Sequence, residues 1–194
     1  VNAVNLTTDV ATGWKDNDNI AIASTSRTWT EAEDGQVNGD AVGVALTVDG
    51  FGGVGGGLAA AHQGTDNAAG DSCRAEIINL TRNVKVTSFN AGFDGYVLLD
   101  VGSTCDIDYV EFYELGMNAV DKYGFVCKTT AASTVHYNSF YNMYRGCSEV
   151  RNYCDNFTFD HNVIYNIAHD GVYVYGDTVH TITNNIVIAA TGWG

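Results

Sequence analysis

The strongest candidate chemistry in this sequence involves one carboxylate, one imidazole and one guanidinium. Asp170 directly follows His169, and Arg145 directly follows Tyr144. If the fold brings these side chains within a few ångströms of one another, they could serve acid–base cleavage of a polysaccharide or the binding of a sugar. They also fit an ordinary ion pair that contributes under ~1 kcal/mol to stability. Both interpretations need an element that places residues 145 and 170 side by side.

A repeat of about 25 residues supplies such an element from about residue 80 onward. Two columns of similar residues recur with this period. The first column, at steps of 27, 28, 24 and 23 residues, contains Asn83, Val110, Asn138, Asn162 and Asn185. The second column, whose members open apolar strands, contains Gly95, Ala119, Gly146 and Gly171. The residues just before the second column form a candidate surface line of Asp94, Asn118, Arg145 and Asp170.

Two columns that share one slightly elastic period are typical of a coiling chain, with about three short strands in each turn. The apolar runs are short, rich in β-branched and aromatic residues, and bounded by Gly, Asn or Asp. We therefore predict an all-β fold, a right-handed, single-stranded parallel β-helix of the pectate-lyase-like solenoid type. The asparagine column is predicted to form a hydrogen-bonded ladder at a bend. The alternative is an antiparallel sandwich with a strand every ~8–12 residues, which gives no reason for the matching columns.

The first 72 residues do not follow this repeat. Strands are predicted at 20–23 and 42–48, with a polar segment between them, and six glycines between 50 and 57 indicate an exposed loop. This loop matches G-x-G-x-x-G, but no βαβ unit surrounds it, so a nucleotide site is not predicted. We expect residues 1–72 to form irregular β strands and a glycine-rich loop that leads into the solenoid, and residues 73–194 to form the coils.

The composition excludes several classes of partner. The chain has 194 residues, with 23 acidic against 9 basic side chains and a net charge of −14. So few cations cannot neutralise a run of phosphates, which excludes nucleic acid as a partner. No stretch approaches the ~20 apolar residues of a membrane-spanning helix. A hydrophobic content of 45 % is sufficient for a core and excludes a disordered acidic tail.

No cofactor and no metal site is predicted. His136, His161 and His180 come from successive repeats, but they stand two, one and five residues before the asparagine column. These different offsets prevent them from converging on one ion. Residues 16–19 resemble the start of a calcium loop, yet Ile20 occupies a position that should be a ligand, so we expect a solvated turn.

Three segments resemble a known family. Residues 14–25, 31–33 and 74–84 read WKDNDNIAIAST, EAE and RAEIINLTRNV. They are similar to the stretch that joins the eight-glycine domain to the parallel β-helix in fibrocystin, fibrocystin-L and the related cell-surface hyaluronidases. The chain departs from the family pattern in its glycine-rich loop and at Asn17, where the family usually has glycine. That second change is mild because both residue types tolerate positive φ.

The resemblance implies a secreted or cell-surface protein, in which this chain is a structural, adhesive or receptor-like β-helix module of a larger surface protein or filamentous assembly. Neighbouring segments or identical subunits would cover the solenoid ends, because an uncapped end exposes unpaired strand edges. The hyaluronidases imply the alternative, a polysaccharide-cleaving glycosidase or a glycan binder, although none of their catalytic residues can be matched here. In that alternative the candidates are Arg145, His169 and Asp170 for catalysis and Asp94, Asn118 and Tyr144 for substrate binding.

Cysteines and glycosylation motifs bear on the extracellular prediction. Cys127 and Cys154 each lie eight residues after a member of the second column, so they should stack on adjacent turns within the span of a disulfide. Cys73 with Cys105 is a second candidate pair, and in the alternative all five cysteines are buried thiols. If the protein is secreted, the three N-x-S/T motifs become glycan sites at Asn5, Asn79 and Asn156.

Overall fold

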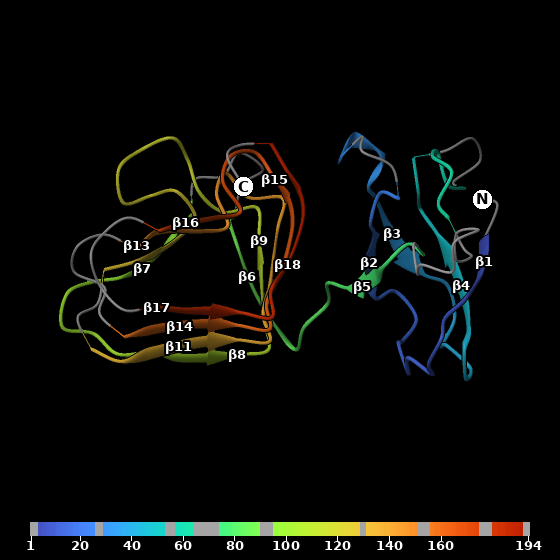
Figure 1. The fold of residues 1–194 in the computed structure, drawn as a ribbon, viewed down its shortest axis with the longest axis horizontal. Coiled ribbons are helices and arrows are strands. Elements are labelled where there is room, and N and C mark those ends of the chain that lie inside the picture. The colour runs from blue at the N-terminus through green and yellow to red at the C-terminus, as the bar shows by residue number, and fades with distance from the viewer. Residues whose placement is uncertain are drawn as a thin grey trace, which may run out of the picture. The chain divides into compact units, whose positions relative to one another are not determined.

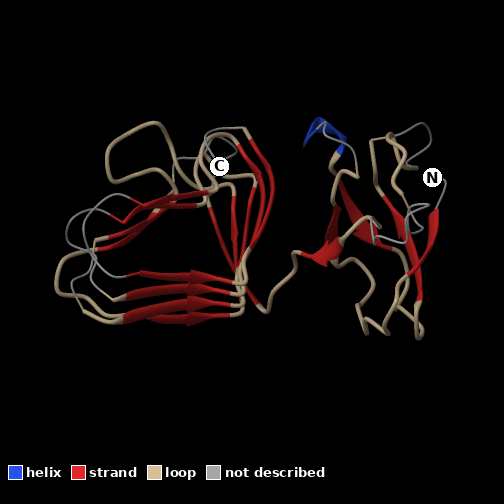
Figure 2. Cartoon of the chain, in the orientation of Figure 1, coloured by secondary structure: helices blue, strands red, loops and turns tan. Residues whose placement is uncertain are grey.

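The structure is a computed structural model that describes residues 4–25, 29–52, 57–63, 74–89, 95–128, 131–150, 156–174 and 180–191. These residues form strands and turns with a single 3-10 turn, η1 (Trp29–Glu31) (Figure 2). None of the helices in the described part is long and apolar enough to cross a membrane. The chain divides into two compact units, Val1–Thr81 and Arg82–Gly194.

The N-terminal unit contains a five-stranded antiparallel sheet with the strand order β1-β4-β3-β2-β5 (Figure 1). Its strands are β1 (Val4–Thr7), β2 (Asn19–Ile22), β3 (Glu33–Val37), β4 (Ala45–Asp49) and β5 (Ile77–Asn79). Two of them match the strands predicted at 20–23 and 42–48. The sequence did not predict β3, because in EDGQV only the valine is apolar. Since β5 pairs with β2, the boundary falls after residue 81 rather than after residue 72.

The C-terminal unit is a parallel β-helix of about four turns, which confirms the predicted fold class. Each turn contributes one strand to each of three parallel sheets (Figure 1). The first sheet contains β7 (Val97–Leu99), β10 (Phe125–Cys127), β13 (Cys147–Val150) and β16 (Val172–Val174). The second contains β8 (Asp106–Asp108), β11 (Ser133–His136), β14 (Phe157–Asp160) and β17 (His180–Thr183). The third contains β6 (Val84–Thr87), β9 (Val110–Tyr113), β12 (Ser139–Tyr141), β15 (Val163–Ile167) and β18 (Ile186–Ala190).

Each turn bends at the same two places through residues with positive φ. The corner between the second and third sheets has one residue with positive φ, which directly follows the strand of the second sheet in every turn. The other corner follows the strand of the third sheet in two turns and falls within β15 and β18 in the other two. Side chains rarely adopt this left-handed backbone region, which asparagine tolerates best after glycine. The eight corner residues, with φ between 48° and 57°, are Tyr109, Tyr137, His161 and Asn184 at the first corner and Glu114, Asn142, Asn166 and Ala189 at the second.

The strand register confirms four members of the asparagine column and excludes the first, Asn83. Val110, Asn138, Asn162 and Asn185 occupy equivalent positions in four turns. Because Val84 pairs with Val110, Asn83 lies one residue before the column. The predicted ladder is present: the side-chain amide of Asn138 donates to Asn162 Oδ1 at 3.2 Å, and that of Asn162 donates to Asn185 Oδ1 at 3.2 Å.

The second column also needs two corrections: Gly124 rather than Ala119 belongs to it, and Gly95 lies one residue before it, because Val97 pairs with Phe125. Phe125 pairs with Cys147, which places Gly124 beside Gly146. The connection from β9 to β10 is longer than those in the next two turns, so equal sequence spacing selected the wrong residue. Small residues are required because the turns approach closely here: a Cβ on Gly124 would lie 2.4 Å from Arg145 O, and one on Gly146 would lie 2.2 Å from Gly171 O.

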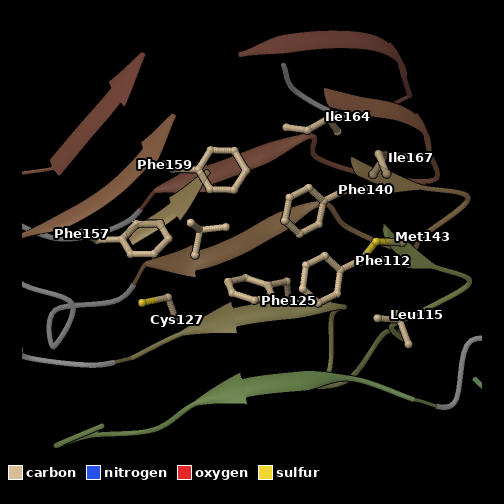
Figure 3. Packing of buried hydrophobic residues seen from close by; sticks show 11 residues of the cluster. Phe112, Leu115, Phe125, Cys127, Phe140, Met143, Phe157, Phe159, Ile164 and Ile167 are labelled. Atoms are coloured by element: carbon tan, nitrogen blue, oxygen red, sulfur yellow. The ribbon is translucent and has the colours of Figure 1, made fainter. Parts of the chain in front are cut away.

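The core of the β-helix consists of stacked aromatic and aliphatic side chains from successive turns (Figure 3). Phe112 and Phe140 stack with ring centroids 4.8 Å apart, and Phe125 meets both rings edge-on. The burial of such rings makes the largest favourable contribution to the folding free energy of a coil of this kind. Stacking of like residues on successive turns adds specific contacts. The N-terminal unit has its own core, formed by Ile20, Ile22, Val37, Leu46, Val48 and Phe51.

Candidate functional site

The structure brings together the charged residues at 145, 169 and 170. Arg145 Nε lies 3.3 Å from Asp170 Oδ2, and His169 Nδ1 lies 2.8 Å from the same oxygen. The cross-turn contact exists because Val172 pairs with Cys147 in the first sheet, which places the residues before these strands side by side. The Asp170 side chain is only 3 % exposed, whereas His169 is 38 % exposed. The predicted juxtaposition is therefore present, with its carboxylate buried and its imidazole at the surface.

Aromatic rings enclose this cluster. The guanidinium of Arg145 lies 4.3 Å from the ring centroid of Tyr123 and 5.1 Å from that of Tyr173. The ring of Tyr144 lies 5.9 Å from that of His169 and 6.3 Å from that of Tyr123. Cation–π contacts of this kind stabilise a partly desolvated guanidinium. Tyr144 was predicted to belong here, whereas Tyr123 and Tyr173 were missed, although Tyr123 directly precedes the correct glycine column.

Asn118 does not lie beside Arg145. The prediction that it stands in one surface line with Arg145 and Asp170 is therefore wrong. Asn118 lies inside the long β9–β10 connection, where the N–H of Met117 donates to Lys122 O at 2.7 Å. Tyr123 takes the place that Asn118 was expected to fill, because the column runs through Gly124. Asp94, the first residue of the predicted line, lies outside the described residues.

A second cluster lies on the outward side of the second sheet. Strand β11 pairs with β8 so that Thr134 faces Asp106 and His136 faces Asp108. The hydroxyl of Thr134 donates to Asp106 Oδ1, and His136 Nε2 contacts Asp108 Oδ1 and lies 3.8 Å from Asp106 Oδ1. The sequence did not predict this group, because a paired-carboxylate motif and a histidine from the next turn become neighbours only through strand register.

Asp160 continues the same surface on the next turn, but its carboxylate is saturated with donors. Thr183 Oγ1 donates to Oδ1 at 2.7 Å, His161 Nδ1 donates to Oδ2 at 2.6 Å, and Asn184 Nδ2 donates to Oδ1 at 3.0 Å. The hydrogen bonds from Thr183 and His161, aided by that from Asn184, hold the pKa of Asp160 at about 2. This carboxylate therefore stays ionised over the whole range in which proteins usually work.

The corner between the second and third sheets, beside this surface, carries an aromatic stack. The rings of Tyr109 and Tyr137 lie 5.3 Å apart and within 7° of parallel, and those of Tyr137 and His161 lie 5.1 Å apart. Because the rings come from equivalent positions of successive turns, their separation follows the stacking of the turns, which is near the ~4.8 Å spacing of strands. The stack therefore runs along the solenoid axis.

The N-terminal unit contains a buried ion pair of its own. Glu33 accepts the N–H groups of Ala59 and Ala60 at 2.7 and 2.8 Å, and His62 Nε2 lies 2.9 Å from Glu33 Oε1. Burial alone raises the pKa of Glu33, but these three partners outweigh it and hold the pKa below the ordinary value of 4.5. His62 Nδ1 faces Ala23 O at 3.0 Å, so both ring nitrogens face acceptors. The pair ties residues 58–62 to β2 and β3.

The structure also describes the turn at residues 16–19 and the asparagines of the three N-x-S/T motifs. Asn17 has a φ of 66° in a turn where Asp18 accepts the N–H of Lys15, as expected for a solvated turn. Asn5 and Asn156 are exposed. Asn79 is half-buried, because its amide donates to Asp18 Oδ2 and its carbonyl accepts the N–H of Thr81.

The disulfide predictions involve residues outside the described part of the chain. Cys154 and Cys73 are not described, and the side chain of Cys147 is not described either. Cys127 is fully buried in the β-helix core, and Cys105 is a half-buried free thiol whose pKa is raised by burial. The described residues contain no disulfide bond.

The fold defines a parallel β-helix protein with an antiparallel sheet ahead of its coils. A scan against protein-family models matched no family, and searches of the curated proteins and of the solved structures found no match. The functional argument therefore depends on the geometry described above.

Proposed function

We propose that this chain is a structural, adhesive or receptor-like β-helix module of an extracellular protein, part of a larger surface protein or filamentous assembly. The observation that carries the proposal is that the charged and aromatic groups at and just beneath its surface contact one another within and across turns. Asp170 contacts Arg145 and His169, and Glu111 contacts Lys85 Nζ at 2.8 Å. Side chains that contact one another in this way stabilise the surface of the coil. In a catalytic site, by contrast, the acid and the base are directed at the substrate.

The aromatic stack supports the same proposal. Sugar rings bind to proteins by lying on an open aromatic face. In the Tyr109–Tyr137–His161 stack the rings lie against one another, so the middle ring has a neighbour on each face and directs only its edge to solvent. Tyr123 and Tyr173 face the Arg145 guanidinium in the same manner. These faces stabilise the solenoid instead of offering a platform for a glycan.

The last described turn supports assembly through its edge. Ile182 and Val187 are 38 % and 46 % exposed, although their equivalents in the preceding turn, Phe159 and Ile164, are fully buried. The N–H of Ile186 donates to Asn162 O, and the N–H of the next residue points the opposite way because directions alternate along a strand. We infer that a neighbouring segment or an identical subunit pairs with this edge and covers the apolar side chains.

Sedimentation velocity and electron microscopy of the purified protein test this proposal. Val187→Pro removes the outward N–H, and Pro is tolerated on an edge strand; Val187→Ala shortens the side chain but keeps the N–H. We expect the wild type and Val187→Ala to form larger species or filaments and Val187→Pro to stay as single short rods with unchanged circular dichroism. Single rods for all three proteins at high concentration would contradict assembly through this edge.

The alternative function is a glycan binder or polysaccharide-cleaving glycosidase. One observation favours it: Arg145, His169 and Tyr144 surround a buried carboxylate at the surface of the solenoid. Incubation of the protein with extracellular polysaccharides such as hyaluronan, followed by measurement of polymer length, tests cleavage. A loss of polymer length that His169→Gln abolishes and Lys122→Met preserves would favour the enzyme over the structural module.

Extracellular location is a further part of the proposal. The exposed positions of Asn5 and Asn156 would suit N-linked glycans, whereas the hydrogen-bonded Asn79 is a poor acceptor. The sequence predicts Cys127 with Cys154 as the disulfide in that setting, with Cys73 and Cys105 as a second pair. The register places Cys127 three residues after Gly124, so the equal eight-residue spacing behind the first pair is not kept. Peptide mapping of the secreted protein with and without reductant tests both, and alkylation of Cys127 without reductant would remove the first pair.

A further inference from the structure

We propose that Asp106, Asp108 and His136 form a binding site for a first-row divalent transition metal, with Zn²⁺ as the best-fitting ion. One ligand atom from each of the three residues lies within 4.8 Å of the other two. Among the described residues this is the one group of three carboxylate, imidazole or thiol side chains so closely placed. The site lies outside the Arg145 cluster and on a different sheet.

Strand geometry explains why the three side chains converge. Asp106 and Asp108 are two residues apart on β8, so both point outward from the same face. His136 is the residue that β11 places directly beside Asp108. Two ligands therefore come from one turn and the third from the next, and an ion bound between them would link β8 to β11.

The distances are close to those that a metal needs. His136 Nε2 contacts Asp108 Oδ1 and lies 3.8 Å from Asp106 Oδ1. An ion ~2.0–2.2 Å from each of its ligands holds the ligand atoms roughly 3.3 Å apart in a tetrahedral site. The 3.8 Å between His136 Nε2 and Asp106 Oδ1 is about 0.5 Å longer than this spacing.

An unpartnered ring nitrogen distinguishes this group from the His–Asp pair on the next turn, and in the Arg145 cluster Arg145 Nε and His169 Nδ1 are likewise buried without a hydrogen bond. His136 Nε2 is buried and has no hydrogen bond, because its contact with Asp108 lacks hydrogen-bond geometry. On the next turn, by contrast, His161 Nδ1 donates to Asp160 Oδ2 at 2.6 Å. Asp160 Oδ1 also accepts hydrogen bonds from Thr183 and Asn184. The second His–Asp pair is therefore held by hydrogen bonds within the protein and does not offer its atoms to an ion. The two pairs form an internal comparison.

The donor set selects the ion. An imidazole with two carboxylates suits Zn²⁺ and its first-row neighbours, whereas Ca²⁺ and Mg²⁺ bind through oxygen alone. Three protein ligands leave at least one position of a four-coordinate ion for water. Asp106 is largely exposed, so this open position faces solvent. Binding to the folded state alone would also stabilise the solenoid in proportion to the metal concentration.

Isothermal titration of the whole chain with ZnCl₂, CaCl₂ and MgCl₂ tests the proposal. We expect one Zn²⁺ per chain, bound at least about 10-fold more tightly than Ca²⁺ or Mg²⁺. His136→Gln and Asp108→Asn should each weaken Zn²⁺ binding about 10-fold or more, while the matched variant His161→Gln should leave it unchanged. The absorption spectrum with Co²⁺ in place of Zn²⁺ provides a second measurement, which should show oxygen and nitrogen ligation without a thiolate charge-transfer band.

Three results would overturn the proposal. The first is an absence of Zn²⁺ binding by the correctly folded wild type, and the second is Zn²⁺ binding that both ligand variants retain. The third is a thiolate band in the Co²⁺ spectrum, which would assign the binding to cysteine. If either ligand variant does not fold, as judged by circular dichroism, the remaining variant and the Co²⁺ spectrum of the wild type still decide the outcome.

Discussion

Asn138 and Asn162 form the central step of the ladder that joins successive turns of the β-helix. Asn162 Oδ1 accepts the backbone N–H of Asn138 at 2.9 Å and its side-chain amide at 3.2 Å. The side-chain amide of Asn162 in turn donates to Val135 O at 2.8 Å. Both asparagines are fully buried, so every one of these polar groups depends on its partner in the ladder.

Substitution of Asn162 by Ala should therefore destabilise the protein strongly. The change leaves the buried N–H of Asn138 without its acceptor, a loss of about 1–3 kcal/mol, and removes the hydrogen bonds from the Asn162 amide to Val135 O and Asn185 Oδ1. We expect the free energy of unfolding, measured by urea denaturation, to fall by about 2–4 kcal/mol. Asn166→Gly is the matched control, because it removes an exposed Asn–Asn hydrogen bond and keeps the positive φ. A similar loss in both variants would contradict a special role of the ladder.

The Glu33–His62 pair should make the stability of the N-terminal unit depend on pH. Since the pKa of Glu33 is lower in the folded state than its ordinary value of 4.5, its contribution is present above that value and is lost as the pH falls through the lowered pKa. Glu33→Gln places an amide N–H₂ against donors and should cost about 2–4 kcal/mol at pH 7. Unfolding of both proteins between pH 7 and pH 3 checks this, because the difference between them should shrink below about pH 4.5. A constant difference would show that Glu33 acts only through packing.

Asp160 should titrate far below an ordinary aspartate. Its pKa of about 2 depends first on the hydroxyl of Thr183, so Thr183→Ala should raise the pKa toward the ordinary value of 3.8. Carbon-detected NMR titration of the carboxylate measures this shift. Thr181→Ala, on the same strand and two residues away, should leave it unchanged. An unshifted pKa in Thr183→Ala would mean that His161 and Asn184 set it without the hydroxyl.

Arg145→Met tests whether the Arg145 cluster is structural. The change leaves His169 as the remaining side-chain contact of the buried Asp170 carboxylate, and removal of one partner from a buried pair is costly. We expect a loss of about 2–4 kcal/mol in urea denaturation. Lys122→Met, which removes an exposed cation 5.7 Å from the ring of Tyr96, should change stability by under about 0.5 kcal/mol. Equal stability of Arg145→Met and the wild type would contradict the structural interpretation.

The sequence by itself predicted the coil, because each turn has to repeat the residue types that its position requires. The asparagines at 138, 162 and 185 mark one bend, and the glycines at 146 and 171 mark a place where turns approach closely. These requirements come from local backbone geometry and from stacking on the adjacent turn, so they recur in the sequence with the period of the coil. The contact between Arg145 and Asp170 followed from the same period.

The tertiary structure alone decided which residues stand beside one another where the connections differ in length. The long β9–β10 connection shifts the register by several residues, so Tyr123 rather than Asn118 lies beside Arg145. The spacing of two residues in the sequence is the sum of strand and connection lengths, so it does not show which residues are neighbours. Backbone pairing between strands does show it. For the same reason the convergence of Asp106, Asp108 and His136 arises from a cross-turn register, which is why only the folded coil brings these ligands together.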